Sequence, residues 1–484
     1  MAHGPSPQSE DRSLELSGAE LRDLVERALS HVIPYVDSLA EQPAADLDDL
    51  PPPPASVTGP LPETGTSVDR LFEDLFRDLV PRGFNTASPG YLAFIPGGGL
   101  LHAAVAEFIA AAVNRYVGVS VASPGLVRLE ARVVQWFCEL VGLPAGAGGF
   151  LTTGGSLANW SAVVSARVAR LGAELVGGVI YASEQCHHSV AKAARLAGFP
   201  LGRVRRIPCD ELYRMRPDAL AAAVERDRLE GLAPFMAVAS AGTTNTGAVD
   251  PLGELADLAA REGLWLHVDA AYGGFFLLTE RGRAAMAGIE RADSVTLDPH
   301  KGLFLPYGTG CLLVRRQADL REAHCVHADY MPPPREEDDV EQPDFCEISP
   351  ELSRDFRGLR VWLPLAMHGA GTFRRYLDEK LDLARWAADE LRELEHVEIV
   401  AEPQLSLLAF RYAPPGVEPE EQDRLNQAIL DRVNAGRRVY LTATRLDGRF
   451  VPRICVLHFR THRDRVAECL DAIREALREV AGGS

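Results

Sequence analysis

Six short β-type runs alternate with helical stretches between residues 91 and 314, and this alternation limits the possible folds more than any other feature. The runs are apolar and are bounded by glycine or polar turn residues: GGFLTTG, GGVIYAS, FMAVASAG, LWLHVDAA, DSVTLDP and GCLLVRR. Strands separated by helices can pair in parallel, and a parallel sheet is buried on both faces. The sequence therefore predicts an α/β fold, with a mostly parallel central sheet and helices on both faces.

An N-terminal helical arm is predicted over residues 1–90, where helical periodicity covers 16–39 and 67–79. The proline-rich stretch between them, DLPPPPASVTGPLPETG, should be extended rather than helical. Neither arm helix can bury its apolar face by itself. The arm therefore needs an external apolar surface.

Two more divisions follow from the pattern along the rest of the chain. Residues 91–362 should form the large domain, and 363–484 a small α+β domain with the strand-like runs LSLLAFRY and RICVLHFR. The charged stretch PPPREEDDVEQPD is too polar to pack, which predicts a flexible loop at about 329–350.

Composition excludes several classes of protein. The 484 residues are 46% hydrophobic and 24% charged, the balance of a soluble globular protein. A net charge of −18 disfavours nucleic acid as a partner. The polar N-terminus lacks a signal peptide and no run is long enough to span a membrane, so we expect a cytoplasmic protein without membrane contact.

The eight cysteines are scattered without a C-x-x-C pair, which is typical of reduced thiols. His324, Cys325 and His327 form a local cluster, but no second pair follows at zinc spacing. The sequence therefore predicts no metal site.

Candidate functional residues follow the predicted strands, and in open parallel sheets chemistry collects at the strands' C-terminal ends. In FLTTGGSLANW a strand ends, two glycines allow a tight turn and a helix begins near Ser156. Free N–H groups at a helix N-terminus form a cradle for a phosphate. A simple strand-to-helix turn is the alternative interpretation.

Three further residues occupy such positions. Lys301, in DSVTLDPHKGLFLPYGTG, lies between apolar stretches and is therefore expected inside a cleft. Asp269 directly follows an apolar strand, where its carboxylate needs a partner; a salt bridge or helix cap would also explain it. His187 follows another strand, and a buried core histidine is the ordinary explanation for it alone.

Together these residues suggest one cofactor. Pyridoxal 5'-phosphate requires a lysine for a Schiff base, a carboxylate that keeps the pyridine nitrogen protonated, an aromatic group over the ring and a phosphate cradle. The sequence supplies all four at strand ends, in Lys301, Asp269, His187 and the turn before Ser156. We therefore predict pyridoxal 5'-phosphate as the cofactor.

The chain resembles the pyridoxal-phosphate-dependent group II amino-acid decarboxylases, which include aromatic-L-amino-acid, histidine and glutamate decarboxylases. The resemblance covers nearly the whole chain, through SPGYLAFIPGGG, SVASPGLVRLE, TGGSLANW, SEQCHHSV, AGTTNTGAVDPL, LHVDAAYGG, DPHKG, FRGLRVW and GRFVPRICV. It implies the pyridoxal-phosphate-dependent transferase fold (fold type I, like aspartate aminotransferase). It also implies decarboxylation of an L-amino acid.

Roles for individual residues follow from the same resemblance. Lys301 would carry the cofactor through a Schiff base, His187 would stack on the pyridine ring and Asp269 would pair with its nitrogen. The other implied cofactor contacts are Gly155, Ser156 and Leu157 at the phosphate, His300 beside the lysine, and Thr243 and Ala271 along the ring. Asp298 stands where many relatives have an asparagine that touches the phosphate, and a carboxylate cannot donate there unless protonated.

The resemblance also locates a substrate pocket and an assembly. Its side-chain pocket would contain Phe94, Ile95, Pro96 and Tyr116, which suit an aromatic L-amino acid better than glutamate, although they could also be ordinary core. Arg453 would contact the substrate carboxylate or play a structural part. Family members are homodimers with shared active sites, and the predicted arm fits this arrangement.

Three alternatives stay open. In the family a loop tyrosine is thought to protonate Cα after CO₂ leaves, and a count of nine residues back from Arg354 places its position at Phe345. Phenylalanine has no proton to give, so the product could instead be an aldehyde formed with peroxide, although Tyr330 lies earlier in the same loop. The second alternative is an aminotransferase, and the third is a non-catalytic homologue that binds a partner.

Overall fold

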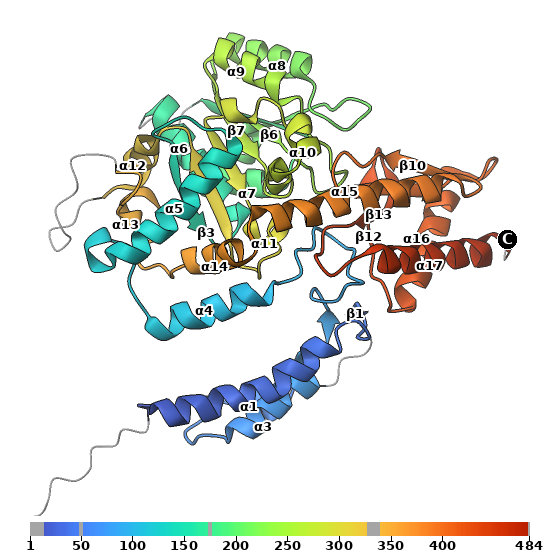
Figure 1. Ribbon diagram of the computed structural model, residues 1–484. Helices are drawn as coiled ribbons and strands as arrows, with labels where there is room; N and C mark the ends of the chain where they lie inside the picture. The colour runs from blue at the N-terminus through green and yellow to red at the C-terminus, as the bar shows by residue number, and fades with distance from the viewer. Residues whose placement is uncertain (1–13, 48–51, 173–176, 327–338, 483–484) are drawn as a thin grey trace, which may run out of the picture.

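The computed structural model describes residues 14–47, 52–172, 177–326 and 339–482, and a seven-stranded sheet forms its centre (Figure 1). The strands lie in the order β3-β9-β8-β7-β6-β4-β5. Their bounds are β3 Gly148–Thr152, β4 Gly178–Ser183, β5 Val204–Ile207, β6 Ala233–Ser240, β7 Trp265–Asp269, β8 Ser294–Leu297 and β9 Gly310–Val314. Only β9 is antiparallel to its two neighbours, so β3 points the same way as the other five strands.

Both faces of this sheet are buried, as predicted. In β4 the side chain of Tyr181 joins one hydrophobic cluster, whereas Ile180 and Ala182 join the other. Helices α6, α7 and α12 contribute to the second cluster, and α8 and α9 to the first. The helices around the sheet are α5 Pro124–Val141, α6 Gly155–Leu171, α7 Ser189–Leu196, α8 Pro217–Leu229, α9 Leu252–Glu262, α10 Glu280–Ala285, α11 Pro299–Gly302, α12 Gln317–His324, α13 Phe345–Ile348 and α14 Gly358–His368.

The six predicted strands of the central sheet are confirmed, and one strand was missed. The sequence of β5 is VRRI, and this strand lies at the edge of the sheet. Because one of its sides is partly exposed, it carries two arginines instead of the continuous apolar run that marks a buried parallel strand.

A second sheet of four antiparallel strands, in the order β10-β11-β13-β12, lies toward the C-terminus. Its strands and helices are α15 Ala370–Arg392, β10 Val397–Ala401, β11 Leu407–Tyr412, α16 Pro419–Ala435, β12 Thr442–Leu446, β13 Arg449–Cys455 and α17 Arg463–Gly482. The predicted α+β character is thus present. The proposed boundary between residues 362 and 363 falls inside α14, and the division into three domains stays a prediction.

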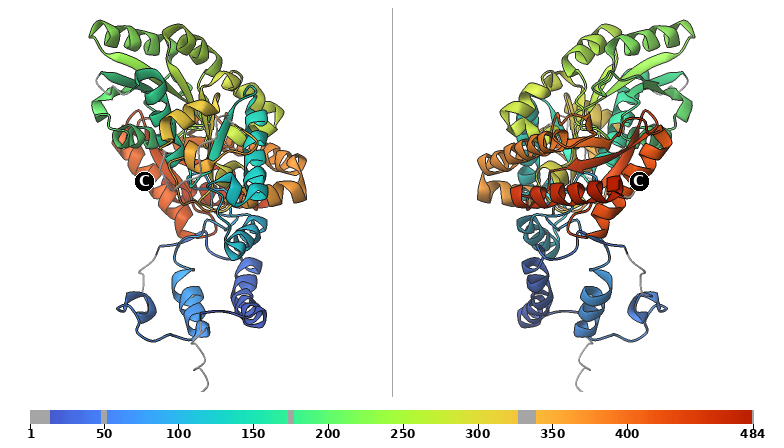
Figure 2. Two further views of the ribbon diagram at one scale, coloured as in Figure 1. Left: turned by 90° about the vertical axis from the view of Figure 1, so that its left-hand side faces the viewer. Right: turned by 90° about the vertical axis from the view of Figure 1, so that its right-hand side faces the viewer.

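The N-terminal helices project from the rest of the molecule (Figures 1 and 2). Helix α1 (Gly18–Asp37) runs beside α3 (Val68–Asp74), which continues into a π-helical turn, Leu75–Leu79. Also within residues 1–90, β1 (Ala45–Asp46) pairs with β2 (Gly83–Phe84) over two residues, and α4 (Leu101–Val113) comes next along the chain. In the part of the chain that the structure describes, no helix is long and apolar enough to cross a membrane.

The proline-rich stretch corrects one expectation. It contains a four-residue helix, α2 (Ala55–Thr58), where we expected extended chain only. Pro54 is the N-cap of this helix, a place where proline does no harm because the first N–H groups of a helix have no intrahelical acceptor. The run Ala55–Thr58 contains no proline, and the helix ends at Gly59.

Candidate active site

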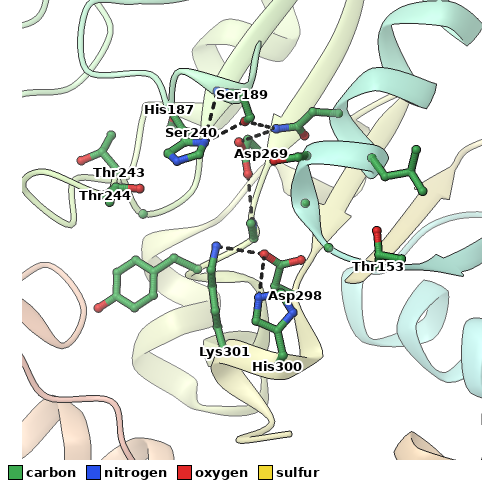
Figure 3. Close-up of a pocket in the computed structure, with 18 residues that line it drawn as sticks. Thr153, His187, Ser189, Ser240, Thr243, Thr244, Asp269, Asp298, His300 and Lys301 are labelled. Carbon is green, nitrogen blue, oxygen red and sulfur yellow. Dashed lines mark hydrogen bonds and ion pairs between the residues drawn. The ribbon is translucent and has the colours of Figure 1, made fainter. Parts of the chain in front are cut away.

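One cavity of about 280 Å³ lies where the parallel strands end, at the N-terminus of α6 (Figure 3). Its walls come from the residues that end or directly follow β3, β4, β6, β7 and β8. The cavity therefore collects the residues that the sequence placed at strand ends. All ten predicted cofactor-binding residues line this cavity: Gly155, Ser156, Leu157, His187, Thr243, Asp269, Ala271, Asp298, His300 and Lys301.

Lys301 extends from the short helix α11 toward the cavity, and its ammonium is paired with Asp298. The distance from Lys301 Nζ to Asp298 Oδ2 is 2.9 Å, and His300 Nε2 lies 3.6 Å from the same oxygen. Burial by itself would lower the pKa of Lys301, but the charge and hydrogen bond of Asp298, helped by Asp269, raise this pKa overall. Asp298 thus compensates a cation that would otherwise be costly to bury.

Two further side chains approach the cavity from neighbouring strands. Asp269 ends β7, and its Oδ1 accepts a hydrogen bond from the backbone N–H of Ala271 at 3.2 Å. His187 lies just before α7, and burial is the main cause that lowers its pKa. A neutral imidazole and a carboxylate therefore face the same space as Lys301 (Figure 3).

The turn into α6 is shaped for a compact anionic group. The backbone of Gly154 and Gly155 leads directly into this 17-residue helix, whose N-terminus carries a partial positive charge. A Cβ on Gly155 would lie 3.1 Å from Asp298 Oδ2 and 3.3 Å from the Cβ of Ala271. Any side chain at this position would therefore narrow the cradle.

These groups fit pyridoxal 5'-phosphate. The cradle at Gly155 suits its phosphate, Lys301 its aldehyde carbon and Asp269 its ring nitrogen. Asp298 needs a different role from the one that the resemblance implied for it. It accepts from Lys301, and its other oxygen, Oδ1, is buried without a hydrogen-bond partner among the described residues.

The residues predicted to bind the substrate side chain do not line the cavity of their own chain. Ile95 and Pro96 are buried, whereas Phe94 is 47% exposed and has a backbone φ of 50°. Tyr116 is 39% exposed, and its hydroxyl donates to the carbonyl of Leu352 at 2.8 Å. Two large aromatic side chains thus remain at the surface of the single chain.

Arg453 is also held away from the cavity wall. It is buried in β13, where its guanidinium donates to the Thr244 carbonyl and, at 3.0 Å, to Thr442 Oγ1. Burial lowers its pKa. Thr244 itself lines the cavity, so Arg453 is one residue removed from it, and its contact with a substrate carboxylate stays a prediction.

Phe345, the position reached by counting back from Arg354, lies in the core. Its side chain is fully buried in the α13 helix, and the Arg354 guanidinium lies 4.5 Å from the centre of its ring. Arg354 in turn forms a buried ion pair with Glu130 at 2.5 Å. Tyr330 and His327 lie outside the described residues.

Sequence reasoning did not single out Asn159, Ser189 or His267. Asn159 lines the cavity together with Ser189, and His267 lies behind it, bonded to the Asn159 side chain at 3.0 Å. The sequence did contain a signal for Asn159 and His267, namely their spacing from predicted site residues. Asn159 follows Ser156 by three residues on a helix and His267 precedes Asp269 by two on a strand, spacings that put side chains on the same face.

Comparison with known proteins places the chain in a family. The pyridoxal-dependent decarboxylase conserved domain matches residues 56–413. The aromatic-L-amino-acid decarboxylase of Bacillus atrophaeus is 34% identical over 471 residues, which cover 97% of this chain and 98% of that protein. The L-2,4-diaminobutyrate decarboxylase of Rhizobium meliloti is 35% identical over 87% of this chain and 84% of that protein.

The fold agrees with these matches. The crystal structure of Oryza sativa TDC with PLP and tryptamine has a TM-score of 0.89 and 27% identity, covering 96% of this chain and 99% of that one. The chain belongs to the pyridoxal-dependent decarboxylase family. It is a pyridoxal-phosphate-dependent amino-acid decarboxylase, a carbon–carbon lyase of fold type I, and the predicted fold, cofactor and enzyme class are confirmed.

Proposed function

We propose that this enzyme decarboxylates an aromatic L-amino acid and releases CO₂ and the corresponding amine. The observation that carries the proposal is the convergence of Lys301, Asp269 and His187 on one cavity beside the cradle of α6. The name of the Bacillus atrophaeus relative supports an aromatic substrate. So do the aromatic side chains of Phe94 and Tyr116, which are 47% and 39% exposed in the single chain.

When bound, pyridoxal phosphate supplies the electron sink that accepts the electrons of the breaking bond between Cα and the carboxylate. The chain's own residues prepare the site for it. Asp269 would offer an acceptor to the protonated ring nitrogen, and the neutral His187 ring would offer a flat surface to the pyridine ring. The cradle at Gly155 and Ser156 would hold the phosphate by backbone N–H groups.

Lys301 would have a second role, because its Nζ would be free of the cofactor whenever a substrate amine took its place. Its ammonium then requires a partner, and Asp298 Oδ2 is already positioned 2.9 Å away. We therefore assign Asp298 as the group that holds the released lysine within the cavity. A proton on Nζ stays close to the reacting atoms in this way.

We further propose a homodimer in which each chain completes the other's active site. The α1 helix has no buried residue, and Leu21, Leu29 and Ile33 on it are each more than 40% exposed. The α4 helix is also apolar and exposes Phe108 and Val105. A second copy that covered these helices would bury their apolar faces and could receive Phe94 and Tyr116 at its cavity.

An amine is the product that we propose, rather than an aldehyde. The oxidative alternative assumed that Phe345 occupies the position of the loop residue that protonates Cα. The Phe345 side chain is instead fully buried and packs against the Arg354 guanidinium. A side chain enclosed in the core of its own chain is poorly placed to act on a substrate in the cavity. Tyr330 retains a phenolic proton that could serve.

We also propose the cytoplasm as the enzyme's compartment. All eight cysteines are free thiols in the structure, and five of them are buried. A reducing compartment suits such thiols.

The test is product analysis with purified holoenzyme and a panel of L-amino acids: tryptophan, tyrosine, phenylalanine, glutamate and 2,4-diaminobutyrate. The proposal expects CO₂ and amine in equal amounts from an aromatic substrate, without peroxide in air. Turnover of 2,4-diaminobutyrate alone would replace the aromatic assignment by that of the Rhizobium meliloti relative. Aldehyde with peroxide would restore the oxidative alternative, and a keto acid without CO₂ would indicate an aminotransferase.

A further inference from the structure

A continuous chain of buried hydrogen bonds runs behind the cavity and ends at Asp269 and His187. It begins in β7 and β8, where the Trp265 indole N–H donates to Ser294 Oγ at 2.8 Å. The same oxygen lies 2.8 Å from His267 Nδ1, and His267 Nε2 lies 3.0 Å from Asn159 Oδ1. His267 and Asn159 are each only 1% exposed, so water cannot substitute for these partners.

The Asn159 amide is the branch point of this chain, and all four of its hydrogen-bonding positions are used. Its oxygen accepts from His267 and, at 2.7 Å, from Thr296 Oγ1. Its nitrogen donates to Asp269 Oδ2 and to Ser189 Oγ, both at 2.9 Å. An asparagine has two acceptor sites and two donor hydrogens, so no capacity remains.

Chemistry fixes the direction of every bond in the chain. An ionised carboxylate only accepts, so the nitrogen of Asn159 must face Asp269 and its oxygen must face His267. His267 Nε2 therefore carries a proton. Burial lowers the pKa of His267 to about 4, which leaves the ring neutral and its Nδ1 free to accept from the Ser294 hydroxyl.

The second branch fixes His187 in the same way. The Ser189 hydroxyl oxygen accepts from Asn159, so its hydrogen is directed to His187 Nδ1, 2.8 Å away. The backbone N–H of Ser189, which can only donate, also points to this Nδ1 at 3.3 Å. His187 Nδ1 is therefore an acceptor, and the neutral ring carries its proton on Nε2.

We propose that Asn159 and His267 are positioning residues for decarboxylation: they hold the Asp269 carboxylate as an oriented acceptor and His187 as the Nε2-protonated tautomer. The inference rests on the roles proposed for Asp269 and His187. It goes beyond those roles because it assigns to one amide, that of Asn159, the orientation of both Asp269 and His187. The two side chains proposed to contact the cofactor would then be oriented by a single hydrogen-bond chain anchored in β7 and β8.

Three variants and one control test this role. Asn159→Asp keeps an acceptor for His267 but can no longer donate to Asp269. His267→Gln retains an N–H donor for Asn159, whereas His267→Leu removes it. Tyr181→Phe is the matched control, because it deletes a buried hydrogen bond of 2.9 Å, to Asp227, in the same sheet but away from the cavity.

The proposal predicts that Asn159→Asp and His267→Leu lower kcat by about 10- to 100-fold, the loss typical of a hydrogen bond to a charged group, with KM within about threefold. Both should also alter the absorption spectrum of the bound cofactor, whereas Tyr181→Phe should not. His267→Gln should recover most of kcat. Equal losses in His267→Gln and His267→Leu, or unchanged kcat and spectrum in Asn159→Asp, would overturn the proposal.

A measurement on the unmodified apoprotein keeps the test independent of folding defects and of the reaction. In protein labelled with ¹⁵N-histidine, the spectrum of His267→Gln identifies the His267 signals by difference. The proposal expects a protonated Nε2 and an unprotonated Nδ1 at pH 7. An imidazolium, or the opposite tautomer, would overturn it whatever the substrate of the enzyme proves to be.

Discussion

At the scale of single residues, the site depends on charges that compensate one another. Asp298 balances Lys301 at 2.9 Å, and Asp269 is held by Asn159 and by the backbone of Ala271. The types of these residues were readable from the sequence because strand-end positions in a parallel sheet converge. The pairing of these residues could not be read from the sequence. A lysine can reach several carboxylates, and only the folded backbone determines which carboxylate it pairs with.

Removal of the Asp269 carboxylate tests the most important of these charges. Asp269→Ala should still bind the cofactor, because the cradle and Lys301 remain, but kcat should fall by at least about 1,000-fold for want of an acceptor at the ring nitrogen. Steady-state kinetics with cofactor titration measures both. Asp269→Glu keeps the charge and serves as the control, while a wild-type rate in Asp269→Ala would refute the role.

The buried His267 predicts a dependence of stability on pH. Burial lowers its pKa from 6.5 in the unfolded chain to about 4 in the fold, so protons bind the unfolded chain more tightly. Its contribution is therefore fully present above pH 6.5 and is lost as the pH falls toward 4. Between pH 7 and pH 5 the free energy of unfolding should fall by about 2 kcal/mol through this group.

Urea unfolding of the apoprotein at pH 7 and pH 5 provides the measurement. His267→Gln lacks the titrating group, so its loss of stability over this range should be smaller than that of the unmodified protein by about 2 kcal/mol. Other histidines whose pKa is lowered by the fold, such as His458 and His324, titrate alike in both proteins, so their contributions cancel. Equal losses of unfolding free energy in the two proteins would contradict the lowered pKa of His267.

At the scale of elements, the strands buried on both faces were predictable, whereas partly exposed or very short elements were not. Six strands, including the edge strand β3, have both faces buried and therefore read as apolar runs, whereas β5 is partly exposed and carries two arginines. The α13 helix was missed because a four-residue helix shows no periodicity in a sequence. Its Phe345 was read as part of a loop for the same reason.

The N-terminus of α6 carries a prediction of its own. In Gly155→Ala the added Cβ would lie 3.1 Å from Asp298 Oδ2 and narrow the cradle, so the Kd of the cofactor should rise by about tenfold. Gly125→Ala is the matched control, since Gly125 also lies in the first turn of a helix but its Cβ would meet open space.

Cofactor titration by absorbance compares the two variants, and thermal unfolding of the apoproteins checks that both are folded. Alanine is favoured over glycine in a helix by about 1 kcal/mol, so neither apoprotein should be greatly destabilised. The same cofactor affinity in both variants would show that the turn does not hold the phosphate.

At the scale of the whole molecule, the account predicts active sites shared between two chains. If Phe94 acts in the partner's cavity, a hybrid of one Lys301→Ala chain and one Phe94→Ala chain contains one site with both residues intact. We expect Lys301→Ala to be inactive and Phe94→Ala to have little activity, and random reassociation of the two should then restore roughly a quarter of the wild-type activity per site.

The outcome separates the two arrangements. If Phe94 serves the cavity of its own chain, every hybrid site lacks one of the two residues and mixing restores nothing. Sedimentation of each variant before mixing confirms that both are dimers. A monomer with full activity would contradict both the dimer and the shared site.

The central claim is that Lys301 carries the cofactor, and chemical mapping tests it most directly. Borohydride reduces a Schiff base to a stable amine, so reduction of the holoenzyme followed by proteolysis and mass spectrometry identifies the modified lysine. The account predicts pyridoxyl phosphate on the peptide that contains Lys301 and on no other, and none in Lys301→Ala. Modification of a different lysine, or of none, would contradict it.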